Sequence, residues 1–342
     1  MNVDPLIATA VVIVIMAGLT ILGLPVAFAM ISGSVLGLLI FVSPAAMNIA
    51  QYHLFNNLTQ SLYIAIPLFT FMASLIESSG ISTDLYDMML KWFGGLRGGL
   101  AIGTVAICTV VAAMTGLAAT AVVTMGLLAY PEMKKRGYHN MIALGCIPAG
   151  GVLGPLIPPS ILMIIVAGFA SLSVGKLFIG GLIPGLLTAF LFIIYIAVAS
   201  FIRPELAPAL PPEDRANWKE KFISLRGVIL PISLIILVLG GIYSGAFTPS
   251  EAGGIGSFGA IICAAIHRKL SLNTLRRSSI TTLKVTVMVL WLCIAGSILS
   301  AFLTAAQATY ALSNFLSGLP VHPMSIIVIM MVIVLVMGMF VD

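Results

Sequence analysis

The sequence predicts an all-α polytopic membrane protein, and both its composition and its charge distribution indicate that class. Of the 342 residues, 60% are hydrophobic and 8% are charged, whereas soluble domains average about 45–50% apolar and about 25% charged residues. Asp, Glu, Lys and Arg are absent from 5–76, 98–131, 137–175 and 285–341. Each of these stretches is long enough for at least one membrane-spanning helix.

Several other classes of protein are excluded. A transmembrane β-barrel would alternate apolar and polar residues over about ten positions, whereas these apolar runs are continuous. A net charge of +5 reflects basic loops and not a nucleic-acid-binding surface. No HExxH, GxSxG or paired-cysteine motif is present, so we expect no enzyme activity, no disulfide, no cofactor and no metal other than a transported ion. The isolated histidines and cysteines are His53, His139, His267, His322, Cys108, Cys146, Cys263 and Cys293.

The N-terminal part predicts paired helices and an interfacial segment. Residues 6–24 and 25–42 are apolar and are joined by a short glycine–proline turn, which indicates two antiparallel spans. Residues 44–61 are too polar to cross and are expected at the membrane interface. The run 62–76 is shorter than a full span and carries Pro67.

The next segments predict an amphipathic helix and a broken helix. Residues 77–100 mix charged and large apolar side chains, which indicates an interfacial helix ending at Gly94–Gly95. Residues 101–130 are apolar, but a straight helix of that length would overshoot a bilayer. Thr115–Gly116 lies at the centre of this run, and we expect the helix to break there.

The strongest local signal lies in the apolar stretch 141–170. Four prolines and three glycines fall within 148–159, which is incompatible with a continuous helix. Either this segment is a proline-kinked structural helix or it is a functional break, and the clustering favours the break. Irregular backbone at membrane depth requires protein or a water-filled cavity around it, and transporters use such breaks to bind ions and substrates. Thr115 alone is more often a back-bonded helix hydroxyl than a ligand.

The remainder of the chain predicts a second half of similar layout. Residues 177–201 form another span, and the polar segment 203–226 is expected to be an aqueous linker. Five further segments follow: apolar runs at 228–243, 252–266, 285–312 and 326–341, and a basic loop at 267–277. Within 285–312 only Gly296 offers a break point. We therefore divide the chain into N-terminal scaffold helices (1–61), a first repeat with a re-entrant hairpin (62–201), a linker (202–227) and a second, incomplete repeat (228–342).

Five segments resemble the large membrane subunit of the tripartite ATP-independent periplasmic (TRAP) transporters, the DctM-like family. They are 66–81 (IPLFTFMASLIESSGI), 94–116, 125–145, 150–161 (GGVLGPLIPPSI) and 245–253 (GAFTPSEAG). The resemblance implies an inverted-repeat, elevator-type, sodium-coupled importer of small organic acids in the bacterial inner membrane. It also implies a small DctQ-like membrane subunit and a DctP-like periplasmic substrate-binding protein as partners.

The resemblance also implies a sodium site in the first hairpin. In the family a serine-rich tip and the backbone of a Gly-x-x-(Ile/Val)-Pro-Pro turn hold the ion. Here the tip reads Ala-Ala-Met-Thr115-Gly116-Leu, so among its side chains Thr115 alone keeps a hydroxyl, while the turn is intact at Gly154, Ile157 and Pro159. Backbone carbonyls can supply most of the ligands of such an ion. The surrounding hairpin and substrate region would include Pro155, Pro158, Ser160 and Glu251.

Two features leave alternatives open. Glu251 lies between apolar runs and is either a membrane charge that needs a partner or watery surroundings, or, with Ser250, part of the N-terminus of the next helix. The family pattern continues past Asp342 into a second hairpin, so we expect the second repeat to be truncated and residues 1–342 alone not to transport. The rival functions are a stand-alone ion-coupled carrier of the same superfamily and a non-transporting membrane scaffold.

Overall fold

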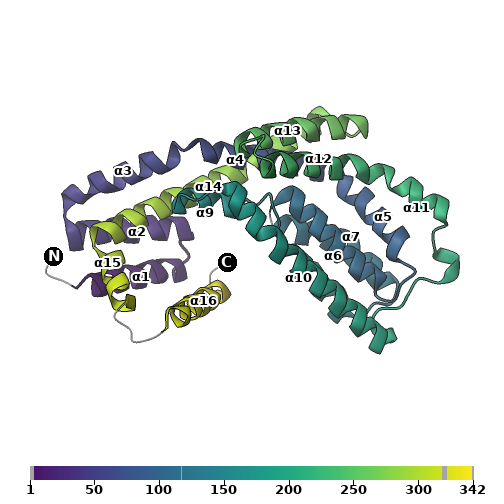
Figure 1. Ribbon diagram of the computed structural model, residues 1–342, viewed down its shortest axis with the longest axis horizontal. Coiled ribbons are helices and arrows are strands. Elements are labelled where there is room, and N and C mark those ends of the chain that lie inside the picture. The colour runs from purple at the N-terminus through teal and green to yellow at the C-terminus, as the bar shows by residue number, and fades with distance from the viewer. Residues whose placement is uncertain (1–3, 117, 318–321, 341–342) are drawn as a thin grey trace. The chain divides into compact units, whose positions relative to one another are not determined.

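A computed structural model describes residues 4–116, 118–317 and 322–340, and every regular element in these ranges is helical (Figure 1). The helices of the first half are α1 (Pro5–Ile21), α2 (Val26–Gly37), α3 (Met47–Leu58), α4 (Ala65–Ser78), α5 (Ile81–Phe93), α6 (Gly99–Thr115), α7 (Ala118–Lys135), α8 (Asn140–Gly151), α9 (Ile161–Ala170) and α10 (Val174–Ile202). Those of the second half are α11 (Trp218–Ser224), α12 (Arg226–Tyr243), α13 (Pro249–Ile266), α14 (Leu272–Ala305), α15 (Ala308–Ser317) and α16 (Pro323–Phe340).

The chain groups into two compact units, one formed by 59–289 and the other by 1–58 together with 290–342. The boundary falls inside α14. These units are defined by contacts in space, whereas the two repeats were inferred from the order of segments along the chain. The two-repeat division therefore stays a prediction.

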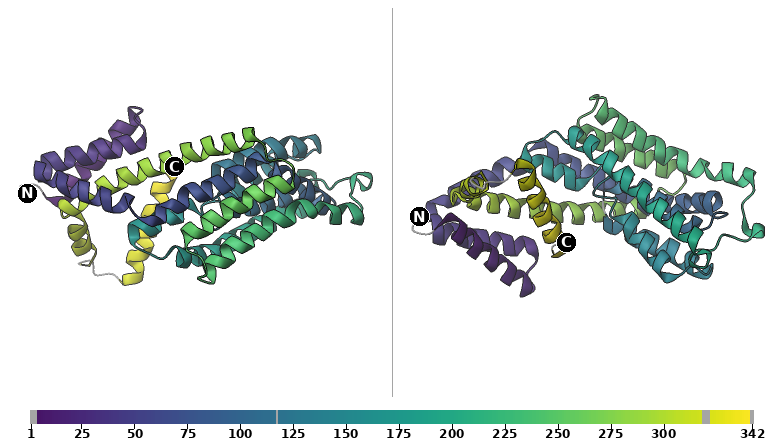
Figure 2. Two further views of the ribbon diagram at one scale, coloured as in Figure 1. Left: turned by 90° about the horizontal axis from the view of Figure 1, so that it is seen from above. Right: turned by 60° about the horizontal axis from the view of Figure 1, so that its bottom comes forward.

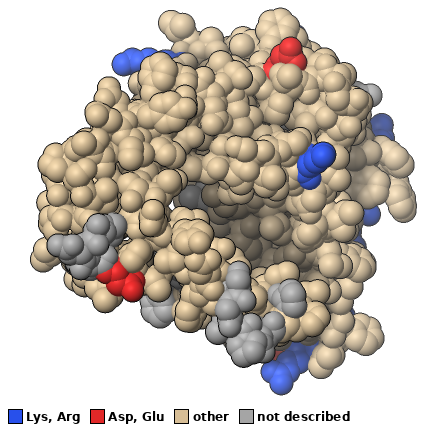
Figure 3. Space-filling model, turned by 60° about the vertical axis from the view of Figure 1, so that its left-hand side comes forward, with Lys and Arg blue, Asp and Glu red and all other residues tan. Residues whose placement is uncertain are grey.

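Four described helices are long and apolar enough to cross a membrane: Ser61–Ser78, Val174–Ile202, Pro249–Ile266 and Leu272–Ala305. The pair α11 and α12, bent by 44°, would make a fifth span if counted as one. Shorter apolar helices include α1, α8 and α9. The face shown in Figure 3 is mostly uncharged, and on α10 the side chains of Ile183 and Tyr195 are 71% and 65% exposed. Apolar side chains facing outward along a long helix are typical of lipid contact, which agrees with a multi-pass membrane protein.

Small residues set the packing of the 59–289 unit. Gly253 and Gly256 on α13 lie against Leu68 and Met72 of α4, and the Ser257 hydroxyl donates to the Leu68 carbonyl at 2.7 Å. Without Cβ atoms at these positions the two helices approach closely, as is usual in membrane bundles. The chain reverses at the break between α6 and α7, so the two helices lie side by side (Figures 1 and 2), and α8 packs against both.

In the other unit, α1 and α2 form the predicted antiparallel pair and pack on the C-terminal part of α14. The core includes Val12, Leu38 and Phe302, all fully buried. Gly37 lies between Val12 and Phe302 and leaves no room for a Cβ. Asn57 at the end of α3 donates to the Ser297 hydroxyl at 3.0 Å, which ties α3 to α14.

Several expected boundaries differ from the observed ones. Residues 61–64 form a 3₁₀ turn that extends α4, so this span reaches 18 residues and is not short. Pro148 lies inside α8, and the break begins only after Gly151. A single proline removes one helical N–H group, and here this does not end the helix. The basic loop is shorter than expected because the Ser271 hydroxyl accepts from the Thr274 N–H at 3.0 Å and starts α14 there.

The one possible break point that the sequence offers within 285–312, Gly296, does not interrupt the helix. Gly296 lies within α14, and the helix ends at Ala305. The chain instead turns at Gln307, whose φ is 56°. A non-glycine residue in this left-handed region is uncommon, so the sequence offered no cue for this position.

The segment expected at the membrane interface, 77–100, and the linker expected to be aqueous, 203–226, are both partly covered by protein. The apolar face of α5 is buried, with Ile81 and Leu85 fully inaccessible, and it packs on α6. The helix ends at Gly94 as predicted. In the linker, the Leu210 N–H donates to the Gly94 carbonyl at 2.9 Å, and the Leu210 side chain is 3% exposed. The linker is therefore packed against the helices along part of its length and is not wholly aqueous.

Candidate functional site

The break between α6 and α7 falls where the sequence predicts it. α6 ends at Thr115 and α7 begins at Ala118. Gly116 between them is buried and has a φ of 61°, a left-handed conformation that glycine adopts without steric cost. The Thr115 side chain lies outside the described part of the chain, so its role as a ligand stays a prediction.

The second predicted break is a compact turn between α8 and α9. The Gly154 N–H donates to the Gly151 carbonyl at 3.0 Å, and the Ile157 N–H donates to the Leu153 carbonyl at 2.8 Å. Ser160 is fully buried, and its hydroxyl accepts from the Met163 N–H at 3.3 Å, which caps α9. The turn is thus an ordered, buried non-helical segment, as the clustered glycines and prolines predict.

The two breaks are in direct contact. A Cβ built on Gly116 would lie 2.5 Å from the Pro159 carbonyl oxygen and 3.2 Å from the Ser160 Cα. Backbone therefore meets backbone, with no side chain between the tip and the turn. The sodium site that the family resemblance implies needs the tip and the turn to lie together, and the geometry has them touching.

The other side of the turn rests on α10. Built Cβ atoms on Gly181 and Gly185 would lie 2.9 Å and 3.5 Å from the Leu156 carbonyl oxygen. These two glycines are four residues apart and so share one face of α10, as in the small-xxx-small pattern of membrane helices. The turn is therefore held between the Gly116 tip and a glycine face, a contact that sequence reasoning missed although the GLIPG spacing could have indicated it.

The turn carries more hydrogen-bond acceptors than donors. Pro155, Pro158 and Pro159 have no N–H group, yet each contributes a carbonyl oxygen. Among the described residues, no backbone N–H outside the regular helices donates to a carbonyl from Gly154 to Pro159. α6 and α8 both end at this site, and helix C-termini carry partial negative charge. Surplus carbonyls beside two helix C-termini are suited to a hard cation.

Glu251 has a local role at the start of α13. Its Oε2 accepts from the Thr248 backbone N–H and from the Thr248 hydroxyl, each at 2.8 Å. The Thr248 hydroxyl in turn accepts from the Glu251 N–H at 3.3 Å. This reciprocal arrangement is a capping box, and it supports the helix N-terminus interpretation of Glu251. Ser250, expected to share that role, instead donates to the Ser61 carbonyl at 2.9 Å.

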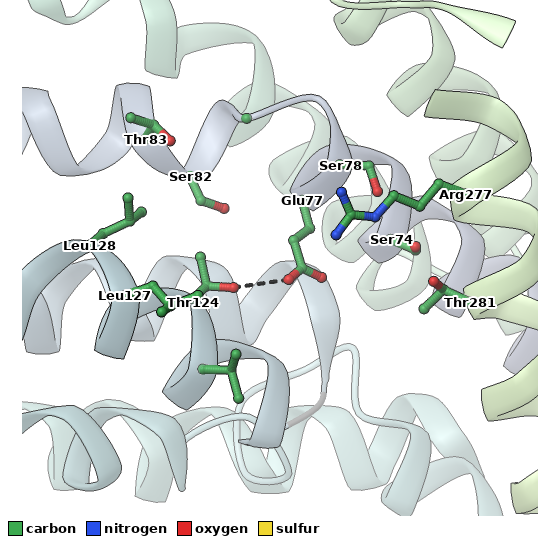
Figure 4. A pocket seen from close by; sticks show the side chains of 12 residues that line it. Ser74, Glu77, Ser78, Ser82, Thr83, Thr124, Leu127, Leu128, Arg277 and Thr281 are labelled. Atoms are coloured by element: carbon green, nitrogen blue, oxygen red, sulfur yellow. Dashed lines mark hydrogen bonds between the residues drawn. The ribbon is translucent and has the colours of Figure 1, made fainter. Parts of the chain in front are cut away.

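A polar cavity of about 560 Å³ within the 59–289 unit was not predicted. Glu77 near the end of α4 accepts from the Thr124 hydroxyl of α7 at 2.9 Å, and Arg277 of α14 reaches toward the same space (Figure 4). Glu77 belongs to the segment 66–81 that carries the family resemblance, whereas Arg277 was assigned to a basic loop. Because the two residues are 200 positions apart in the sequence, nothing local indicated that they line one cavity.

Comparison with known proteins identifies the family. Residues 13–342 match the DctM component of the tripartite ATP-independent periplasmic transporters. The C4-dicarboxylate TRAP transporter large permease protein DctM of Pseudomonas aeruginosa is 30% identical over 305 residues, which cover 89% of this chain and 70% of the relative. The ectoine TRAP transporter large permease protein TeaC of Halomonas elongata is 29% identical over 336 residues, covering 98% and 78%.

The sialic acid TRAP transporter large permease protein SiaM of Vibrio cholerae is 27% identical over 330 residues, covering 95% of this chain and 75% of the relative. All three relatives are transport permeases, which confirms the expectation that the chain is not an enzyme. With its apolar helices and buried helix breaks, the chain belongs to the DctM family of large permease subunits of TRAP transporters.

Proposed function

We propose that this permease imports small organic acids across the bacterial inner membrane in a sodium-coupled, elevator-type cycle. The coupling ion would bind at the contact between the Thr115–Gly116 tip and the turn Gly154–Pro159. Its ligands would be mainly the surplus carbonyl oxygens of the turn, with the Thr115 hydroxyl as an additional ligand.

The observation that supports this proposal most directly is the backbone contact of Gly116 with Pro159 and Ser160. Two helices that break for purely structural reasons have no need to bring their breaks together. Paired breaks leave carbonyl oxygens and helix ends facing one small volume, which is how secondary transporters assemble ion and substrate sites. The N-termini of α7 and α9 lie at the same contact, and they would favour an anionic substrate group.

The names of the relatives support the substrate class and the partners. They include transporters of C4-dicarboxylates, of 2,3-diketo-L-gulonate and of sialic acid, all of which are acids. The family is one component of a tripartite transporter. We therefore propose that a periplasmic binding protein delivers the acid and that a small membrane subunit completes the permease.

Uptake into proteoliposomes tests the proposal. The transporter that contains this chain is reconstituted with its small subunit and binding protein, and Na⁺ is replaced by K⁺ or choline on both sides. We expect uptake of the cognate acid to stop without Na⁺. Undiminished uptake in K⁺ would contradict sodium coupling, and equal uptake without the binding protein would favour a stand-alone carrier.

A further inference from the structure

The polar cavity between α4, α7 and α14 has the composition of a ligand site. Its volume of about 560 Å³ exceeds that of a small organic acid, and six hydroxyl side chains line it. These are Ser74, Ser78, Ser82, Thr83, Thr124 and Thr281. The cavity also receives one carboxylate, from Glu77, and one guanidinium, from Arg277 (Figure 4). A few polar groups directed into one concavity are typical of small-molecule sites.

Helix stability does not explain Glu77. This residue is the penultimate one of α4, where the partial negative charge of the helix end disfavours a carboxylate. Its described hydrogen bond comes from the Thr124 hydroxyl at 2.9 Å, whereas an ionised carboxylate can accept about four hydrogen bonds. The carboxylate therefore keeps acceptor capacity for a ligand.

Arg277 supplies the complementary group. None of the ion pairs found among the described residues includes it, although its guanidinium is directed toward the space beside Glu77 and Ser78 (Figure 4). A guanidinium presents five N–H donors in a plane, which suits two-point binding of a carboxylate. The cavity walls thus carry a group that binds anions, the Arg277 guanidinium, and a hydrogen-bond acceptor, the Glu77 carboxylate.

We propose that this cavity binds small solutes that carry one carboxylate and one hydrogen-bond donor. The carboxylate binds Arg277, and the donor, a hydroxyl or a protonated amine, binds Glu77. A second carboxylate in the solute would face the Glu77 carboxylate, and this like-charge contact selects against dicarboxylates. The inference rests on the proposed transport of organic acids and specifies their chemical class.

Protection of an engineered thiol measures binding at the cavity directly. Leu127 lines the cavity and is 75% exposed, so Leu127→Cys places a reactive thiol at its wall. The four native cysteines are buried and will react slowly. The complete transporter with this substitution is placed in phosphatidylcholine vesicles, and the rate of maleimide labelling is measured against solute concentration.

Three solutes with the same four-carbon skeleton separate the chemical requirements. They are 4-aminobutyrate, 4-hydroxybutyrate and succinate. We expect 4-aminobutyrate and 4-hydroxybutyrate to protect the thiol at concentrations at least about tenfold lower than succinate, because a repelled charge costs at least the 1.4 kcal/mol that corresponds to tenfold in affinity. Equal protection by succinate in the unaltered cavity would overturn the inference.

Two substitutions and two matched controls assign the effect to residues. Arg277→Gln should weaken protection by all three solutes at least about tenfold, whereas Arg276→Gln, at the adjacent residue, which does not line the cavity, should change it by less than about twofold. Glu77→Gln should bring succinate within about twofold of 4-hydroxybutyrate by removing the repelled charge. Asp87→Asn, an exposed carboxylate paired with Lys91, should leave the order of the three solutes unchanged. Wild-type protection in Arg277→Gln would overturn the inference.

Two further measurements distinguish a bound solute from a bound lipid and the cavity from the sodium site. Vesicles containing phosphatidylserine test whether a lipid headgroup, which carries the same carboxylate and amine, fills the cavity. If the thiol is labelled slowly without added solute in phosphatidylserine vesicles but not in phosphatidylcholine vesicles, the assignment of the cavity to a solute is overturned. Sodium-dependent uptake is measured in parallel. If uptake proceeds but no solute protects the thiol, the cavity inference fails while the proposed function stands. If solutes protect in the expected order but uptake does not need Na⁺, the proposed coupling fails and the cavity site stands.

Discussion

Replacing Gly116 with alanine should separate the tip from the turn and weaken ion binding. The added Cβ would lie 2.5 Å from the Pro159 carbonyl oxygen, where ordinary contacts begin at 3.4 Å. One backbone would have to move by about 0.9 Å, and overpacking of this kind costs about 1–3 kcal/mol. The positive φ of 61° adds about 1–2 kcal/mol for a residue with a Cβ.

The total of about 2–5 kcal/mol opposes the state in which the tip and the turn touch. If the ion binds only in that state, its apparent affinity falls with the population of the state. A cost of about 2 kcal/mol corresponds to an increase of roughly thirtyfold in the Na⁺ concentration for half-maximal uptake. The assay is initial uptake into proteoliposomes as a function of Na⁺ concentration.

Gly245 provides a matched control. It has a φ of 75°, and a built Cβ there has no neighbour within 4 Å. Gly245→Ala therefore carries the left-handed backbone cost without the steric clash. We expect its half-maximal Na⁺ concentration to stay within about twofold of wild type, because the turn between α12 and α13 does not contribute to the ion site. An equal effect of the two substitutions would refute the argument from the close contact.

Three further substitutions test local parts of the structure. Thr115→Val should raise the half-maximal Na⁺ concentration less than Gly116→Ala does, because it removes one oxygen and leaves the carbonyls; complete loss of uptake would contradict ligation mainly by the backbone. Thr248→Val removes the N-cap of α13 and should lower the free energy of unfolding by about 1 kcal/mol, measured by thermal denaturation in detergent; no change would show that the capping box is unimportant. Tyr138→Phe leaves the Leu100 N–H without the 3.2 Å acceptor and should cost about 1–3 kcal/mol. Burial raises the pKa of Tyr138 to about 12, so this loss should be constant between about pH 6 and pH 9 and diminish only above about pH 10, where tyrosine in the unfolded chain ionises.

Local sequence chemistry was sufficient for most helices and for both breaks. A run of apolar residues without charges predicts a membrane helix because backbone polar groups in lipid must be paired within the helix. Thr115–Gly116 and the turn around Pro155, Pro158 and Pro159 were identified because glycine and proline change backbone conformation independently of distant residues. The Gly94 end of α5 was identified for the same reason.

Other features depended on contacts between distant segments. Glu77 and Arg277 lie in different parts of the sequence. They reach one cavity only because α4 packs against α13 and also contacts the start of α14. The Ser278 hydroxyl, adjacent to Arg277, donates to the Ser74 carbonyl at 3.2 Å and fixes this arrangement. The turn at Gln307 was missed because a glutamine gives no local signal for a positive φ.

The sequence by itself determined the fold class and the two segments that cannot be helical, because each follows from the chemistry of neighbouring residues. It also indicated the family, through five segments that resemble it. The tertiary structure alone decided that the tip meets the turn through Gly116, that Gly181 and Gly185 support the other side of the turn, and that a carboxylate and a guanidinium share a cavity. These features depend on the distances at which separate helices pack, and a few ångströms of helix–helix approach are set by the whole bundle rather than by any one segment.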